Sequence, residues 1–111
     1  MTSGRRAGAR DQRSHPRAAV EIAVSCQQAG TSPVLGVTRD LGIGGAFIVS
    51  AHPPPFGAFV VIVGRLPGTT NDSRLHGIVR WMKPDGFGVQ FGTLGPPETY
   101  AILTILKDIS N

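Results

Sequence analysis

The sequence predicts a mainly β protein, a small antiparallel barrel or sandwich with a C-terminal α-helix packed against it. Short stretches of alternating or wholly apolar residues follow one another along most of the chain. Fifteen glycines and nine prolines among 111 residues place many turns between these stretches. Only the last stretch carries apolar residues at helical spacing. The length suits a single domain.

Six strands are expected in sequence. The first covers residues 18–26 and places Val20, Ile22, Val24 and Cys26 on one face. The other five are expected over residues 34–39, 46–50, 58–63, 74–82 and 86–91.

Two of these strands carry predictions about their faces. Residues 58–63 are almost wholly apolar and β-branched, which is typical of a strand covered on both faces. In residues 74–82, strict alternation places Trp81 on the same side as Leu75 and Val79, as a packing or rim residue. The Lys83-Pro-Asp-Gly86 run that follows predicts a hairpin turn.

The C-terminal helix is expected after residue 95. Pro96 and Pro97 suit the first turn of a helix, and Lys107 suits its last turn. The apolar residues that recur at helical spacing, and that should face the barrel or sandwich, are Ile102, Ile105, Leu106 and Ile109.

The net charge of +4 is concentrated at the N-terminus. Five of the eleven basic residues are arginines within the first seventeen positions, where Asp11 is the only acid. We expect residues 1–12 to form a flexible basic arm and residues 13–109 to form the domain. Neither a secretory signal nor a membrane-spanning run is expected, and the single cysteine, Cys26, fits a reducing cytoplasm.

Arg13 and Arg17 are the first candidate binding residues. They lie four positions apart in the segment Arg-Ser-His-Pro-Arg, directly before the first expected strand. Pro16 disfavours a regular helix here, and a bent segment would let both side chains converge on one ligand. A planar guanidinium can bind phosphate oxygens or the O6/N7 edge of guanine with two parallel hydrogen bonds. Taken alone, the pair is weak evidence for a site, since two arginines in a basic tail are usually solvated.

The second candidate is the segment Asp40-Leu-Gly-Ile-Gly-Gly45. The Asp40 carboxylate can accept hydrogen bonds from guanine N1–H and N2–H₂ together, a pair of donors that adenine lacks. Gly42, Gly44 and Gly45 allow positive φ angles and a close approach of the backbone to a ligand. Taken alone, the segment also fits a plain turn between strands that begins with Asp.

Together the two segments resemble the PilZ domain family, bacterial receptors for cyclic di-GMP whose motifs are RxxxR and D/NxSxxG. The segments GGAFI, GIVRWM and GFGVQF agree with this, and the resemblance covers residues 13–106. It implies a six-stranded antiparallel barrel with a C-terminal helix. It also implies that Arg13 and Arg17 hold phosphates and guanine, that Asp40 contacts a guanine edge, and that residues 42–45 form the floor of the site.

The sequence departs from the family pattern at two positions. Gly42 stands where the motif has serine, and Gln12 stands where many members have another arginine before RxxxR. Loss of one neutral hydrogen bond at position 42 predicts roughly two- to tenfold weaker binding.

The resulting expectation is a non-enzymatic cytoplasmic receptor that binds cyclic di-GMP through Arg13, Arg17, Asp40, Gly42 and Gly45, and signals to a bacterial protein partner. The alternative is a degenerate PilZ adaptor that binds proteins and no nucleotide. A basic barrel that binds RNA or single-stranded DNA is a third candidate, disfavoured by the few tryptophans and tyrosines. No catalytic group, metal site or cofactor is expected, since the histidines and acids show no suitable spacing.

Overall fold

The computed structural model describes residues 16–110, of which the side chains of residues 109 and 110 are not described. The predictions about Arg13 and the basic arm therefore lie outside the described residues. The strands are β1 (Ala18–Ala19), β2 (Ala23–Gln27), β3 (Val34–Leu41), β4 (Gly45–Val49), β5 (Phe59–Gly64), β6 (Ser73–Lys83) and β7 (Gly86–Phe91), and the helix is α2 (Pro96–Ser110).

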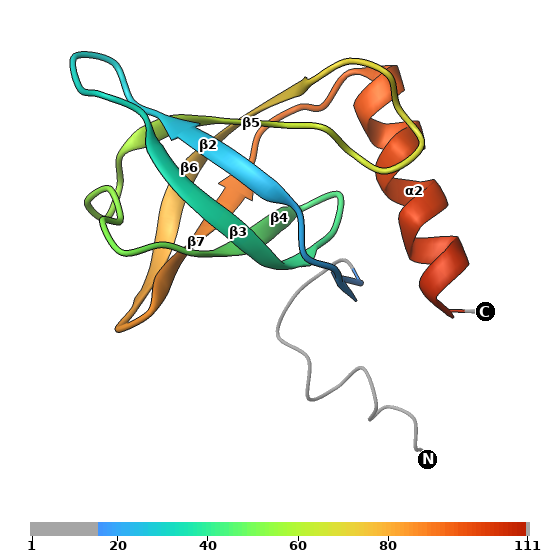
Figure 1. Ribbon diagram of the computed structural model, residues 1–111, viewed down its shortest axis with the longest axis horizontal. Helices are drawn as coiled ribbons and strands as arrows, with labels where there is room; N and C mark the ends of the chain where they lie inside the picture. Colours follow the sequence, from blue (N-terminus) through green and yellow to red (C-terminus); the bar gives the residue numbers. More distant parts are fainter. Residues whose placement is uncertain (1–15, 111) are drawn as a thin grey trace.

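Strands β2 to β7 form a closed antiparallel barrel, with β1 as a short additional strand (Figure 1). The sheet order is β1-β3-β2-β5-β6-β7-β4, and a further pairing of β3 with β4 closes the ring. Each of the six longer strands thus has a hydrogen-bonded neighbour on both sides. The barrel confirms one of the two architectures that the sequence allowed.

The first expected strand is interrupted between Ala19 and Ala23. Both pieces, β1 and β2, pair with β3. At the interruption the buried Thr38 side chain substitutes for part of the backbone ladder. Its Oγ1 accepts from the amide of Ile22 at 2.9 Å and donates to the carbonyl of Val20 at 2.6 Å. These bonds satisfy two backbone groups that the change of direction leaves without strand partners.

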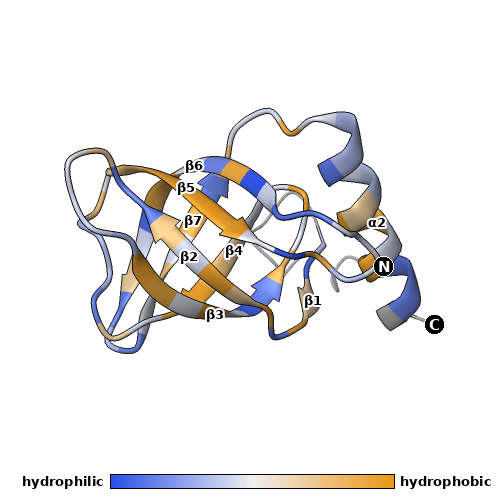
Figure 2. Ribbon diagram, turned by 45° about the horizontal axis from the view of Figure 1, so that its top comes forward, coloured by the Kyte–Doolittle hydropathy of each residue, from blue (hydrophilic) through white to orange (hydrophobic). Residues whose placement is uncertain are grey.

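The apolar core lies inside the barrel and extends to one end of it, where α2 packs (Figure 1). Phe87, Val89 and Ile48 from the strands are fully enclosed, as is Ile102 from the helix. Figure 2 shows hydrophobic residues running along β2 to β5, as the alternating pattern of the sequence requires. The helix and the burial of Cys26 agree with the sequence predictions.

Two predictions about strand faces were wrong, for physical reasons that the structure makes clear. β5 is covered on one face only: Val60 and Ile62 point into the core, whereas Phe59 is 76% exposed on the outside. In β6 the register with β7 shifts between Val79 and Trp81. This β-bulge reverses the alternation, so Trp81 lies on the outer surface with 42% of its area exposed.

Candidate functional site

The site begins with the turn between β3 and β4. The amide of Gly42 donates to the carbonyl of Gly45 at 2.9 Å, which brings the two strand ends together. None of the glycines in this turn has a positive φ angle, so the turn does not use the backbone freedom that glycine allows. Their role is to allow the close approach of other chain segments, whereas the sequence analysis expected a close approach to a ligand.

The approaching segment is Pro16–Arg17, just ahead of β1. A Cβ atom at position 42 would overlap with the carbonyl oxygen of Pro16 and lie 3.0 Å from Cγ of Arg17. A Cβ atom at position 45 would overlap with the carbonyl oxygen of Val89 and lie 3.0 Å from Nη2 of Arg17. The N-terminal segment therefore lies directly on the glycine turn, and only glycines leave room for it.

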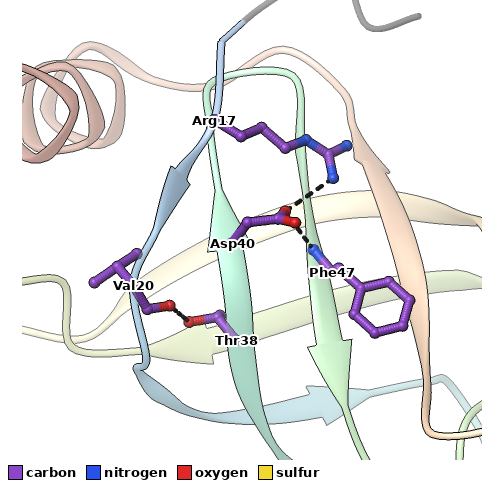
Figure 3. A network of polar contacts seen from close by, with 5 residues as sticks. All are labelled: Arg17, Val20, Thr38, Asp40 and Phe47. Carbon is purple, nitrogen blue, oxygen red and sulfur yellow. Dashed lines mark hydrogen bonds and ion pairs between the residues drawn. The ribbon is translucent and has the colours of Figure 1, made fainter. Parts of the chain in front are cut away.

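Asp40 joins this segment to the barrel (Figure 3). The β3–β4 register shifts between Thr38 and Asp40, which places Asp40 opposite Phe47. Its Oδ1 accepts from the Phe47 amide at 3.2 Å and from Nη1 of Arg17 at 3.0 Å. The Arg17 side chain is 9% exposed and that of Asp40 is 25% exposed. The structure thus brings together Arg17, Asp40 and the glycine turn, as the two motifs predict.

Trp81 is a further member of the site that the sequence analysis missed. The Cζ atom of Arg17 lies 5.3 Å from the centre of the Trp81 ring, within the range of a cation–π contact. The ring also lies against Gly88, its cross-strand partner, where a Cβ atom would overlap with it. A tryptophan facing a glycine across a predicted hairpin was the signal available in the sequence. Strict alternation concealed it, because it placed Trp81 on the core side.

Arg39 is a nearby cation with different partners. Its Cζ atom lies 4.6 Å from the centre of the Phe47 ring, and its Nη2 bonds to the carboxylate of Asp85 in the β6–β7 turn. The Arg39 hydrogen bond lowers the pKa of Asp85 below its usual value. In this arrangement Arg39 is paired with Asp85 and not with Asp40.

The described residues do not form a metal-binding site. Among them, no group of three His, Cys, Asp or Glu side chains is placed to hold a metal ion. Cys26 is enclosed in the core, where burial raises the pKa of its thiol to about 11. No helix in the described part of the chain combines the length and the apolar character needed to cross a membrane.

The fold and the site together define a small β-barrel module with an arginine-covered glycine turn on its surface. A model of the PilZ domain matches residues 11–108, and the chain belongs to the PilZ domain family, a family of cyclic di-GMP receptors. No curated protein sequence matches the chain.

Solved structures confirm the fold. The PilZ domain of CeSA from a cellulose-synthesizing bacterium aligns with a TM-score of 0.65 at 19% identity, over 86% of this chain and 99% of that one. The PilZ domain of YcgR from Escherichia coli, solved with c-di-GMP, aligns with a TM-score of 0.70 at 12% identity, over 89% of this chain and 92% of that one. The inhibitor of motility MotI/DgrA from Bacillus subtilis aligns with a TM-score of 0.70 at 15% identity, over 90% of this chain and 53% of that one.

Proposed function

We propose that this chain is a non-enzymatic cytoplasmic receptor for cyclic di-GMP that signals to a protein partner. The observation that carries the proposal is the pairing of Arg17 with Asp40 at 3.0 Å above the Gly42–Gly45 turn. This places a guanidinium, a carboxylate and a closely approachable backbone at one point of the surface. These are the groups that phosphate and guanine require.

In the proposed complex, Arg17 is the principal phosphate and guanine ligand. A guanidinium has five N–H donors, and Asp40 engages only one of them through Nη1. Asp40 holds the guanidinium of Arg17 in place through the ion pair, and the Trp81 ring packs against that guanidinium. Because Arg17 is 9% exposed, cyclic di-GMP must displace the Pro16–Arg17 segment from the turn to reach it. Arg13 is proposed as the second cation.

Isothermal titration of the full chain with cyclic di-GMP tests the proposal. Arg17→Ala and Asp40→Ala should each weaken binding by roughly 10- to 150-fold, since a charge-assisted hydrogen bond contributes about 1.5–3 kcal/mol. Arg65→Ala is the matched control, because Arg65 pairs with Asp72 on an exposed loop and should leave binding unchanged. Absence of heat and of chemical-shift changes at ligand concentrations on the order of tens of micromolar would refute the proposal.

A protein adaptor that binds no nucleotide is the second candidate. It is favoured by the close packing of Pro16 and Arg17 on Gly42, which fills the position where the family has a serine side chain. Such an adaptor would give no titration heat with cyclic di-GMP. Its partner would bind equally well to the wild type and to Arg17→Ala.

A further inference from the structure

The outer face of the barrel holds a cavity that the proposed ligand site does not use. It has a volume of about 500 Å³ and lies over β5, β6 and β7 beside the end of β2. We call it the β5–β6 groove. Its apolar centre and polar rim are formed by Phe59, Val61, Ile78, His76, Arg80 and Gln90.

The centre of the groove is an apolar surface turned to solvent. Phe59 faces Ile78 across the β5–β6 pairing, and both lie on the side opposite the core residues Val60 and Val79. Phe59 is 76% exposed although it is the first residue of strand β5 and pairs with Ile78. An exposed aromatic ring inside a concave patch is typical of a surface that buries a partner's side chain.

The charge around the groove has one sign. Arg80 lines the groove, Arg74 lies outside the lining on the same strand, and none of the four strands β2, β5, β6 and β7 contains an acidic residue. Nε of Arg80 donates to Oε1 of Gln90 at 3.2 Å, which fixes the guanidinium over the groove without neutralising it. Arg17, Arg39 and Arg65, which lie outside the groove lining, pair with carboxylates.

The closed barrel, the positive charge and the exposed ring indicate what kind of partner could bind in the groove. Because the barrel is closed, a partner cannot add a strand to β5 or β6 and must dock through its side chains. The positive rim disfavours a second copy of this chain, which would bring two basic grooves together. One exposed ring, the guanidinium of Arg80 held by Gln90, and Arg74 farther along the same strand suit an apolar anchor flanked by carboxylates.

We propose that the β5–β6 groove docks an acidic segment of a partner protein. The segment places one apolar side chain against Phe59 and Ile78 and carboxylates beside Arg80 and Arg74. The proposal rests on the proposed function for its place in signalling, since the groove is then the surface through which the receptor reaches its partner.

The bulge in β6 connects the groove to the ligand site. Arg80 lines the groove, and the next residue, Trp81, contacts Arg17. The register shift between Val79 and Trp81 puts both side chains at the same irregular point of the strand. Displacement of Arg17 by cyclic di-GMP would remove a contact from Trp81, the residue next to Arg80 in the chain.

The test uses the full chain and two synthetic peptides, one with a central Leu-Phe flanked by Asp and Glu and one with the same core flanked by Lys. Backbone amide shifts are followed by NMR without cyclic di-GMP and then with it. The acidic peptide should shift the amides of Phe59, Ile78 and Gln90, and the basic peptide should not. Phe59→Ser and Arg80→Ala should each weaken binding at least about tenfold, which corresponds to about 1.4 kcal/mol.

Leu35→Ser is the matched control for Phe59→Ser, since Leu35 is exposed on β3 away from the groove, and Arg65→Ala is the control for Arg80→Ala. The proposal is overturned if the acidic peptide leaves the groove amides unchanged or binds equally to Arg80→Ala. If the groove amides shift when the protein alone is diluted, the groove is instead a contact surface between two copies of this chain. Groove shifts with oligo(dT) but not with the peptide would assign it to nucleic acid. Docking is first measured without nucleotide, so it can fail independently of the receptor function.

Discussion

At the scale of single residues, Gly42 has a role that the motif comparison does not suggest. The comparison treats it as a serine that has lost a hydroxyl group. In the structure, the absence of a side chain lets the Pro16 carbonyl and Arg17 lie on the turn. The same contact places Arg17 within reach of Asp40. The glycine at position 42, which departs from the motif, and the Arg17–Asp40 pair, which follows it, therefore depend on each other.

Gly42→Ser should therefore destabilise the protein and should not strengthen ligand binding. The new Cβ atom overlaps with the carbonyl oxygen of Pro16, so the segment that holds Arg17 beside Asp40 has to shift, and such overpacking costs about 1–3 kcal/mol. Urea unfolding and titration with cyclic di-GMP measure the two effects. Gly92→Ser is the control, because a Cβ atom there lies 3.9 Å from its nearest neighbour. Unchanged stability together with tighter binding would show that the missing hydroxyl was the limiting factor.

Cys26 gives a prediction about pH. Burial raises the pKa of its thiol from 9.0 to about 11, so the folded state holds the proton more tightly than the unfolded state does. This contribution to stability is fully present below pH 9.0 and is lost as the pH rises to about 11. Its size is at most about 3 kcal/mol. In urea unfolding series, the wild type should lose more stability over this interval than Cys26→Ala, and parallel curves would contradict the prediction.

At the scale of the elements, the turns and alternating patterns were predictable, whereas the irregularities that build the site were not. Strands β3, β4 and β7 and helix α2 lie within a few residues of their predicted positions. The bulges at Arg39 and Arg80 depend on how each strand pairs with its neighbour. The alternation of residues within a single strand does not reveal this pairing, so the bulges could not be predicted from the sequence. Each bulge reorients a residue of the site, Asp40 in one case and Trp81 in the other.

The interruption between β1 and β2 supplies the prediction at this scale. Thr38→Val keeps the shape of the side chain but leaves the Ile22 amide and the Val20 carbonyl without their Oγ1 partner. Each unsatisfied buried group costs about 1–3 kcal/mol, so the variant should be clearly less stable in chemical unfolding. Thr104→Val is the control, because its hydroxyl bonds only to an exposed carbonyl within α2. Equal stability of the two variants would mean that water replaces Thr38 at the interruption.

At the scale of the whole molecule, the closed barrel acts as a rigid support for two adjacent surfaces. Every strand that lines the β5–β6 groove is held on both sides by its neighbours, and the ligand site lies where β3, β4, β6 and β7 meet. The Pro16–Arg17 segment, which the proposed ligand would displace, is fixed by side-chain contacts and not by the barrel ladder. Binding should therefore reorganise this segment while the barrel remains unchanged.

This arrangement predicts how the ligand affects overall stability. A ligand that binds only the folded state adds about 2.7 kcal/mol at one hundred times its dissociation constant. For a domain of this size, that amount should raise the melting temperature by roughly 10 °C or more. Thermal unfolding with increasing cyclic di-GMP should show the rise for the wild type, and Arg17→Ala should require at least about tenfold more ligand for the same rise. GTP serves as the control, because it supplies guanine and phosphates without the cyclic arrangement. An equal rise in melting temperature with GTP would mean that the site binds anions without selecting cyclic di-GMP. No rise with either nucleotide would favour the protein adaptor.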